Sequence, residues 1–540
     1  MKVLFLPDEK TTDAPSMTIL QAGERAGVHI VASCGGHFLC GKCKVRIMPC
    51  DYDKLPPPDD AEVAALSQDE LADGIRLACK VNLPESGSIT VYTSKVYDDL
   101  SRKERITTLP SHFIANFRQY DINDYGIAFD IGTTTVVGML CSFCEGSITA
   151  AVARTNPQGI YGADVISRIQ YAEQSPEHLK AAQQKVIDCF NEIIDTLISE
   201  TTVKCEQIKE VTVVGNTTMS HLFLGVDPSC LARAPFNPVF TNAVTTPAST
   251  LGLHLDPSTN VYVLPNIAGH VGSDITGVML AANLCELPGV NLVIDIGTNG
   301  EVLLSQDGEM LACATAAGPA LEGASIRFGM RAAIGAIEGA DLSGDDIVLN
   351  VIGDASPIGI CGSGLISLIA QMLNIGLLNE KGKLLDRASA LEKGISSQIA
   401  NRLYSDDAGS GFVVSGEIAL TQKDIREVQL AKGAIAAGIS VLLSKMNLCA
   451  QDIDNVLIAG AFGNYIRIED ALRVGLIPPV PLERISLIGN AAGIGACMAL
   501  LSVGHRKLSE FEAEKITHID LTDEASFVNE HMRAMYFPKG

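Results

Sequence analysis

Two nine-residue stretches decide the fold of this 540-residue chain: residues 127–135 read IAFDIGTTT, and residues 292–300 read LVIDIGTNG. Each begins as a buried apolar strand and ends in an aspartate followed by a glycine and polar residues. Later in each half comes another apolar strand that ends in glycine, VTVVGNTT at 211–218 and VLIAGAFGN at 456–464. Because the same order of motifs occurs twice, we expect two related α/β lobes that face one cleft.

The Asp-Ile-Gly-Thr turn has the features of a phosphate-binding loop. Its glycine permits a tight turn, its backbone amides and hydroxyls can donate to phosphate oxygens, and its aspartate can hold Mg²⁺ through water. One copy alone could equally be an ordinary junction between a strand and a turn. Two copies, each followed by the strand-glycine element, indicate a nucleotide site. The sequence has neither a Walker A motif nor a Gly-x-Gly-x-x-Gly after a strand, which disfavours the P-loop and Rossmann folds.

The candidate nucleotide contacts lie in four segments. They are Asp130, Gly132, Thr133, Thr134 and Thr135; Gly215 and Asn216; Asp295, Gly297, Thr298, Asn299 and Gly300; and Gly362, Ser363 and Gly364. The last segment precedes an apolar helix, so its amides either face the nucleotide or only begin that helix. For hydrolysis we expect the two loop aspartates to act, with a water nucleophile oriented by Glu301 or Asp274, although either carboxylate could equally be structural.

Four cysteines near the N-terminus have the spacing of an iron–sulfur ligand set: Cys34-x5-Cys40-x2-Cys43, then 35 residues, then Cys79. A loop wrapped around a cluster can place three thiolates on one side, which a regular helix or strand cannot do, and the glycines of this loop let it bend. Four thiolates satisfy a [2Fe–2S] core. Structural zinc prefers two paired Cys-x2–4-Cys hooks, whereas only one pair occurs here, and a [4Fe–4S] run would be more closely spaced.

Residues 1–96 resemble the ferredoxin family, with the vertebrate-type gap of five residues between the first two cysteines. The stretches 41–43 (GKC) and 77–79 (LAC) carry the rest of this resemblance. The segment 37–39 (HFL) is bulkier than is usual in the family. The resemblance implies an N-terminal β-grasp domain of the [2Fe–2S] ferredoxin type.

The remainder of the chain resembles the actin, Hsp70 and sugar-kinase superfamily, in which ATP lies between two ribonuclease H-like lobes. The resemblance implies residues 130–135 as the first phosphate loop, residues 295–300 as the second, and Gly460 and Gly463 as part of an adenosine motif. The expected organisation is therefore a ferredoxin-like domain (1–96), a polar linker (97–124), a first ATPase lobe (125–290) and a second ATPase lobe (291–540).

Composition limits the partners and the compartment. Lys and Arg number 40 against 63 Asp and Glu, and the formal net charge of −23 opposes binding to nucleic acid or to an anionic membrane. The longest uncharged apolar stretch, about 433–444, is shorter than the roughly 18 residues that a membrane span needs. The apolar run at the N-terminus ends too early for a secretory signal. We therefore expect a cytoplasmic protein, in which disulfides are disfavoured.

Taken together, the two halves resemble the reductive activators of corrinoid-dependent methyltransferases, including those of O-demethylase systems. The stretches 34–43, 129–135, 215–219, 294–301 and 360–364 carry this resemblance. It implies ATP-dependent transfer of an electron through a [2Fe–2S] cluster that reduces an inactive Co(II) corrinoid protein to Co(I). It further implies ATP and Mg²⁺ as cofactors, and as partners a corrinoid protein and an electron donor such as a ferredoxin, a flavodoxin or a reductase. The resemblance is also compatible with a homodimer.

Other functions remain open from the residues alone. The chain could activate a different metalloenzyme, or it could be a small-molecule kinase with an added redox domain. A sugar kinase would need a catalytic base and would not need the four cysteines. A chaperone of the Hsp70 type would carry a β-rich peptide-binding domain, and a plain iron–sulfur carrier would not turn over ATP. Activators of 2-hydroxyacyl-CoA dehydratases hold a [4Fe–4S] cluster between subunits, which the N-terminal cysteine domain argues against.

Overall fold

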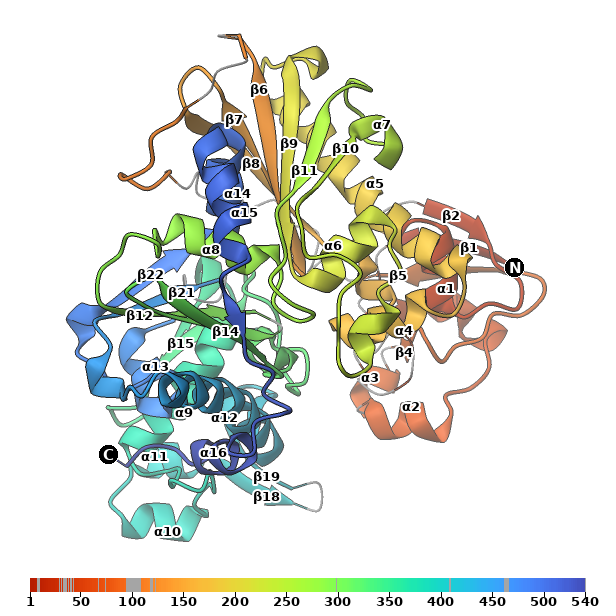
Figure 1. The fold of residues 1–540 in the computed structure, drawn as a ribbon. Helices are drawn as coiled ribbons and strands as arrows, with labels where there is room; N and C mark the ends of the chain where they lie inside the picture. The colour runs from red at the N-terminus through yellow and green to blue at the C-terminus, as the bar shows by residue number, and fades with distance from the viewer. Residues whose placement is uncertain are drawn as a thin grey trace.

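The computed structural model describes all residues except 7–9, 29, 31, 33–35, 37, 39–40, 42, 67, 73, 94–107, 117–119, 122, 298, 407–408, 461–465 and 540. Figure 1 shows a small N-terminal domain beside the first of two larger α/β lobes, with the C-terminal residues returning to the second lobe. The multidomain α/β fold expected from the sequence is confirmed.

The N-terminal domain is a five-stranded sheet in the order β2-β1-β5-β3-β4. Its strands are β1 (Lys2–Leu6), β2 (Lys10–Asp13), β3 (Lys44–Ile47), β4 (Ile75–Leu77) and β5 (Ser88–Tyr92). The central pair β1 and β5 is parallel, and the other pairs are antiparallel. Val3 and Phe5 alternate into the core on β1, as the period of a half-buried strand requires. This arrangement confirms the predicted β-grasp architecture.

Three short helices complete this domain. Helix α1 (Ile19–Arg25) begins at a capping box formed by Thr18 and Gln21. The acidic segment that follows forms two helices, α2 (Asp60–Ala65) and α3 (Gln68–Ala72). They are separate because Leu66, at the end of α2, has an extended backbone.

The first lobe is built on a six-stranded sheet in the order β10-β11-β9-β6-β7-β8. Its strands are β6 (Tyr125–Ile131), β7 (Thr135–Ser142), β8 (Ser147–Thr155), β9 (Ile208–Gly215), β10 (Val244–Pro247) and β11 (Asn260–Val263). Strands β6, β7 and β8 form an antiparallel meander, whereas β9 and β11 run parallel to β6. The helices of this lobe are α4 (Val165–Ala172), α5 (Pro176–Glu200), α6 (Thr217–Leu224), α7 (Ala248–Leu251) and α8 (Ser273–Ala281).

The second lobe repeats this plan with the sheet order β22-β21-β12-β13-β14-β23. Its strands are β12 (Val290–Ile296), β13 (Gly300–Gln306), β14 (Glu309–Thr315), β21 (Asn455–Ala459), β22 (Ile485–Gly489) and β23 (Thr517–His518). Here too an antiparallel meander is followed by two parallel strands. In the first lobe Ile131 lies opposite Gly215, and in the second Asp295 lies opposite Ala459, which brings the next pair, Ile296 and Gly460, to the same place. The internal repeat of the sequence is therefore a repeat of topology and register.

The second lobe also carries most of the inserted structure. Its further strands are β15 (Ala336–Asp341), β16 (Val348–Val351), β17 (Gly359–Ile360), β18 (Leu403–Asp406), β19 (Gly409–Ser415) and β20 (Ile418–Thr421). Its helices are α9 (Gly362–Asn374), α10 (Arg387–Glu392), α11 (Ser397–Ala400), α12 (Gln422–Lys445), α13 (Ile468–Val474), α14 (Ala491–Leu501), α15 (Val503–Ala513) and α16 (Phe527–Ala534). Helix α12 is long and apolar enough to cross a membrane, but 72% of its most apolar window is buried inside the protein, as in the core helix of a soluble fold.

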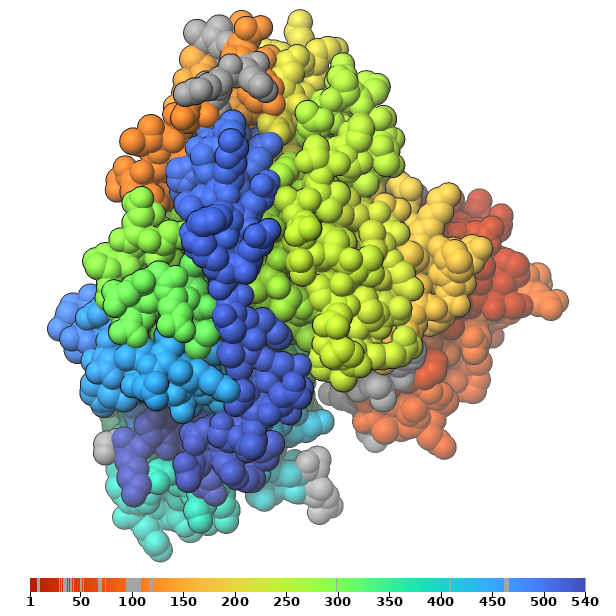
Figure 2. All heavy atoms as spheres, viewed as in Figure 1, coloured from red at the N-terminus to blue at the C-terminus, as the bar shows by residue number. Residues whose placement is uncertain are grey.

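Helices α8 and α14 join the two lobes. They cross in backbone contact, because a Cβ atom on Gly495 would lie 2.0 Å from the carbonyl oxygen of Gly277. The core around them takes side chains from both sheets, including Met139 of β7 and Leu303 of β13. Although α14 and α15 come late in the sequence, they pack against the first lobe, and Figure 2 shows this blue segment directly against it.

The described residues of the predicted linker pack against the ATPase lobes. The backbone N–H of Asn116 donates to the carbonyl oxygen of Leu501 at 3.2 Å, and the ring of Phe113 lies 5.2 Å from that of His505. Tyr120 donates to Glu210 of the first lobe at 2.8 Å. Through these contacts Phe113, Asn116 and Tyr120, in the later part of the stretch 97–124, pack against the ATPase lobes.

Candidate functional site

Two of the four candidate cluster ligands are described, and the structure brings them together. Cys43 precedes β3 and Cys79 follows β4, and their sulfur atoms lie 3.0 Å apart in the core of the N-terminal domain. Cys34 and Cys40 lie outside the described residues. Two buried thiols that meet from different elements suit a shared iron–sulfur centre, because the thiolate is the metal ligand. The donor set described therefore fits the expected cluster.

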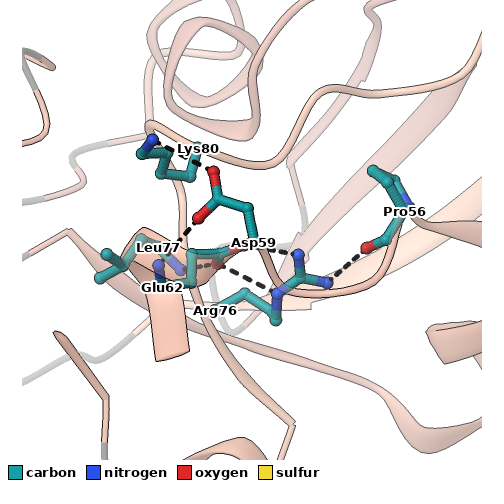
Figure 3. A network of polar contacts seen from close by, with 6 residues as sticks. All are labelled: Pro56, Asp59, Glu62, Arg76, Leu77 and Lys80. Atoms are coloured by element: carbon teal, nitrogen blue, oxygen red, sulfur yellow. Dashed lines mark hydrogen bonds and ion pairs between the residues drawn. The ribbon is translucent and has the colours of Figure 1, made fainter. Parts of the chain in front are cut away.

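A buried ion pair positions Cys79 (Figure 3). The Glu62 carboxylate is 2% exposed and accepts two hydrogen bonds from the Arg76 guanidinium, at 2.7 and 3.1 Å. The same carboxylate accepts the backbone N–H of Leu77 at 3.0 Å. On the other side of the cysteine, Lys80 donates to Asp59 at 3.1 Å. Strand β4 and the turn that holds Cys79 are thus fixed by carboxylates from α2 and from the residue that caps it.

The loop around the cysteines needs its glycines. Gly36 and Gly41 have φ angles of +84° and +63°, a left-handed region that side chains with a Cβ rarely adopt. Gly36 also lies against Leu20 of α1, whose Cδ2 is 3.2 Å from where a Cβ would be. Phe38, the described residue of the bulky segment 37–39, is 54% exposed, and the Lys80 ammonium lies 4.3 Å from its ring centre. This side chain therefore projects to the surface beside the cysteine loop.

The first phosphate loop connects β6 to β7. The N–H of Gly132 donates to the carbonyl oxygen of Thr135 at 2.9 Å, and a Cβ on Gly132 would lie 2.6 Å from that oxygen, so the turn requires glycine. Asn216, which caps α6, donates to the Thr133 hydroxyl at 3.3 Å. The structure thus brings Gly215 and Asn216, two of the predicted nucleotide contacts, against the loop.

A buried arginine lies behind this loop. Arg168 of α4 is 2% exposed, and its guanidinium donates to the backbone carbonyls of Thr133 and Gly162. Burial lowers the pKa of Arg168 to about 9. Asn156 supports the same loop, because its amide donates to the carbonyl oxygen of Gly132 at 2.9 Å. Sequence reasoning missed both residues.

The second phosphate loop connects β12 to β13 and lies among carboxylates. Asp295 pairs directly across the ladder with Glu301, and Asp274 comes from the first turn of α8. Glu301 is buried, whereas the two aspartates keep part of their surface open. The N–H of Gly297 donates to the carbonyl oxygen of Asn299 at 3.0 Å and closes the turn, while Thr298 lies outside the described residues.

The pKa values of these three carboxylates are all raised, in each case first by desolvation. Desolvation, together with the charge of Asp274, raises the pKa of Asp295 to about 7. Desolvation raises the pKa of Asp274 to about 6. The pKa of Glu301 is raised well above its usual range, first by desolvation and then by the two aspartates. Oxygen donors that accumulate negative charge in this way suit a hard divalent cation such as Mg²⁺.

The remaining candidates occupy two different environments. Gly460 has a φ of +90°, and a Cβ there would lie 2.6 Å from the Asp295 carboxylate, so this glycine lets the two strands meet at the loop. Gly463 lies outside the described residues. Gly362 and Ser363 begin α9, while a Cβ on Gly364 would lie 2.0 Å from the carbonyl oxygen of Ile337. For Gly364 the observed contact is therefore the packing of α9 on β15.

Residues of both lobes meet across the cleft. The Thr134 hydroxyl donates to Glu322 at 2.7 Å, and the Arg331 guanidinium donates to the Thr155 hydroxyl at 3.2 Å. A small hollow lies where the lobes face each other, lined by Val165, Asn216, Thr217, Thr218, Gly269, His270 and Asn299. Glu322 and Arg331 carry no local motif, so the sequence offered no signal for either.

The pair Cys141 and Cys144 does not form a common site. Cys141 is buried on β7, whereas Cys144 is exposed in the following turn. Within the described part of the chain, no group of three or more His, Cys, Asp or Glu side chains is arranged to hold a metal ion as the structure stands.

The fold and the site define a class of protein, an ATPase of the actin, Hsp70 and sugar-kinase superfamily with an N-terminal [2Fe–2S] domain. Family models agree along the chain. Residues 5–83 match a 2Fe-2S iron-sulfur cluster binding domain, residues 125–286 match the RACo middle region, and residues 289–540 match the C-terminal domain of RACo, the ASKHA domain. ASKHA is the superfamily that the duplicated loops indicate.

The chain belongs to the family of reductive activators of corrinoid proteins. It is 36% identical to the corrinoid activation enzyme RamQ of Eubacterium limosum, over 99% of both chains. It is 28% identical, over 68% of both chains, to the [Co(II) methylated amine-specific corrinoid protein] reductase of Methanosarcina barkeri. A solved structure of a reductive activator for corrinoid, iron-sulfur protein matches 100% of this chain and 98% of its own, with 30% identity and a TM-score of 0.69.

Proposed function

We propose that this protein is an ATP-dependent reductive activator that returns an inactive Co(II) corrinoid protein of a methyltransferase or O-demethylase system to the Co(I) state. One observation carries the proposal: the paired sulfurs of Cys43 and Cys79 and the two phosphate loops occur on one chain whose full length matches corrinoid activators. A [2Fe–2S] cluster held by the four cysteines would supply a one-electron relay. Neither a kinase nor a chaperone needs that cysteine site.

ATP is needed because the reduction is energetically uphill. Each 59 mV of an unfavourable one-electron step lowers the equilibrium constant about tenfold, which corresponds to about 1.4 kcal/mol. Nucleotide binding can offset this cost only if it favours one arrangement of the complex over another. In this proposal the first loop holds phosphate, and Asp295, Asp274 and Glu301 hold Mg²⁺ and orient the attacking water. The further partners in this proposal are a protein electron donor and a second copy of the chain, in a cytoplasmic setting.

Anaerobic absorption spectroscopy tests this function. A Co(II) corrinoid protein, an electron donor and this protein are mixed with and without MgATP, and we expect the Co(I) band only with MgATP. Cys79→Ser should abolish the band, while Cys144→Ser, the same change at an exposed thiol, should leave it. ATP hydrolysis without Co(I) across several corrinoid partners would contradict the proposal and favour another metalloenzyme as the target.

A further inference from the structure

One segment of the second lobe, residues 318–331, reaches across the cleft to the first lobe. It contains the short 3-10 helix η6 (Pro319–Glu322), which packs against α9 and α12. Glu322 ends this helix, and its carboxylate accepts the hydroxyl proton of Thr134 at 2.7 Å. Arg331, at the other end of the segment, donates to the hydroxyl of Thr155 at 3.2 Å. Residues 318–331 therefore form a bridging segment that contacts the first lobe at two points.

Both contacts fall on the first phosphate loop or on the residues that support it. Thr134 belongs to the loop itself, and Thr155 pairs across the ladder with Thr135, the residue at which the loop ends and β7 begins. The backbone N–H of Asn156, the residue after Thr155, donates to the carbonyl oxygen of Thr134 at 2.8 Å. The bridging segment is thus held at the place where the proposed phosphate would bind.

The bridging segment is also tied to the core of its own lobe. The N–H of Met330 donates to the carbonyl oxygen of Ile360 in β17, the strand that leads into α9, at 2.9 Å. The N–H of Arg327 donates to the Asp424 carboxylate at 2.9 Å. Asp424 is 2% exposed and closes the capping box with Thr421 at the start of α12. A change in the position of this segment must therefore involve the start of α12.

The number of protons on Thr134 limits what its hydroxyl can do. A threonine hydroxyl has one proton to donate, and in this structure Glu322 accepts it. The same hydroxyl can donate to a phosphate oxygen, as expected from the sequence, only if the contact with Glu322 breaks. Since Glu322 is partly buried, its negative charge also opposes the approach of a phosphate. The carboxylate and the phosphate therefore compete for one donor.

We propose that Glu322 is a positioning residue that holds the first phosphate loop in the nucleotide-free protein and is displaced when a phosphate takes the Thr134 hydroxyl. The inference rests on the proposed nucleotide site and adds the group of the second lobe with which phosphate competes. Displacement of Glu322 removes one of the two contacts between the bridging segment and the first lobe, and the tie to Asp424 extends the effect to α12. The coupling is reciprocal: if phosphate weakens the contact, loss of the contact must strengthen nucleotide binding by the same factor.

Nucleotide affinity tests the competition in the full-length, cluster-loaded protein. Calorimetric titration gives the dissociation constant of a non-hydrolysable MgATP analogue for the unaltered protein and for Glu322→Gln, which keeps the shape of the side chain but removes its charge. We expect the variant to bind the analogue about fivefold more tightly. Glu510→Gln is the matched control and should leave the affinity unchanged, because that carboxylate also accepts a hydroxyl proton of the first lobe, from Tyr262 on β11 at 2.7 Å.

Two changes at Thr134 show whether the gain comes from the contact itself. In Thr134→Val, which lacks the hydroxyl, adding Glu322→Gln should improve the affinity less than twofold, since the contact is already lost. In Thr134→Ser, which keeps the hydroxyl, the fivefold gain should persist. A gain of the same size in the valine background would mean that the new amide itself binds the nucleotide, which would overturn the inference.

Hydrogen exchange of the bridging segment provides a second readout. In the unaltered protein we expect the analogue to raise the exchange of peptides covering residues 318–331 at least threefold, and in Thr134→Val the exchange should be raised before nucleotide is added. Weaker nucleotide binding by Glu322→Gln would indicate a merely structural contact, and lower ATP turnover at unchanged affinity would indicate a catalytic role; either result would overturn the inference. No nucleotide binding by the unaltered protein would instead overturn the proposed function, and this inference with it.

Discussion

The two predicted phosphate loops share a topology but differ in the charged side chains that surround them. Each follows a central strand and precedes an antiparallel partner, yet Asp130 lies opposite Val137 whereas Asp295 lies opposite Glu301. Behind the first loop is the buried cation of Arg168, and beside the second is the Asp274 carboxylate. The two halves therefore share one scaffold and differ in the charged side chains that surround each loop. We interpret the first loop as the phosphate side and the second as the metal side.

The largest effect expected from this division is loss of metal-dependent turnover. Asp295→Asn removes a carboxylate from the acidic half, and we expect MgATP hydrolysis to fall about 1,000-fold, or about 4 kcal/mol, with a higher Mg²⁺ requirement. Steady-state ATPase assays over a range of Mg²⁺ concentrations measure both quantities. Asp341→Asn, which alters an exposed carboxylate at the end of β15, is the control. An unchanged Mg²⁺ requirement in Asp295→Asn would show that the metal is held elsewhere.

The second effect concerns the crossing of helices α8 and α14, which joins the two lobes. A methyl group on Gly495 would overlap the Gly277 backbone of α8, so Gly495→Ala must separate the helices that join the lobes. We expect the free energy of unfolding to fall by about 3 kcal/mol, the upper part of the range for overpacked cores. Chemical denaturation measures this change. Gly344→Ala, where a methyl would meet nothing closer than 4.0 Å, should stay within about 0.5 kcal/mol of the unaltered protein.

A smaller effect, on nucleotide affinity, should distinguish the first loop, which lies in front of Arg168, from the second loop with its carboxylates. Arg168→Met keeps much of the buried apolar volume but removes the donors to Thr133 and Gly162. We expect nucleotide affinity to fall about 10- to 30-fold, or about 2 kcal/mol, in line with the loss of a hydrogen-bonded charged group. The Mg²⁺ requirement should stay the same. Calorimetric titration with MgADP gives the affinity, and an altered Mg²⁺ requirement would contradict the division of roles.

Local motifs and tertiary contacts differ in how far sequence could predict them. Asp130 and Asp295 were predicted because each lies at the end of its strand within a repeated motif. Arg168 and Glu322 were not, because each reaches its loop from another part of the chain, with Glu322 188 residues away from Thr134. In the sequence, such residues look the same as ordinary charged residues on a protein surface. Gly495 was likewise missed, since a lone glycine in an apolar helix does not reveal which helix crosses it.

The arrangement of the two lobes was likewise only partly predictable from the sequence. The duplicated strand order was predictable because strand and glycine recur in register. The return of α14 and α15 to the first lobe was not, because it depends on partners such as Glu210, whose carboxylate pairs with Arg506. Only the folded chain brings these two residues together, 296 positions apart.

The smallest effect is a pH dependence confined to the acidic half. Without metal, folded Asp295 and Asp274 hold protons up to pKa values of about 7 and about 6, whereas the unfolded chain releases them near 3.8. Because the folded state binds more protons in this window, stability must fall as the pH rises from about 4 through about 7. Between pH 5 and 8 we expect the unaltered protein in EDTA to lose about 1 kcal/mol more than Asp295→Asn, measured by denaturant titration at each pH. Added Mg²⁺ should reduce that difference, because the cation offsets the charge that the lost protons leave behind. Equal pH profiles for the two proteins would mean that these carboxylates do not form one acidic site.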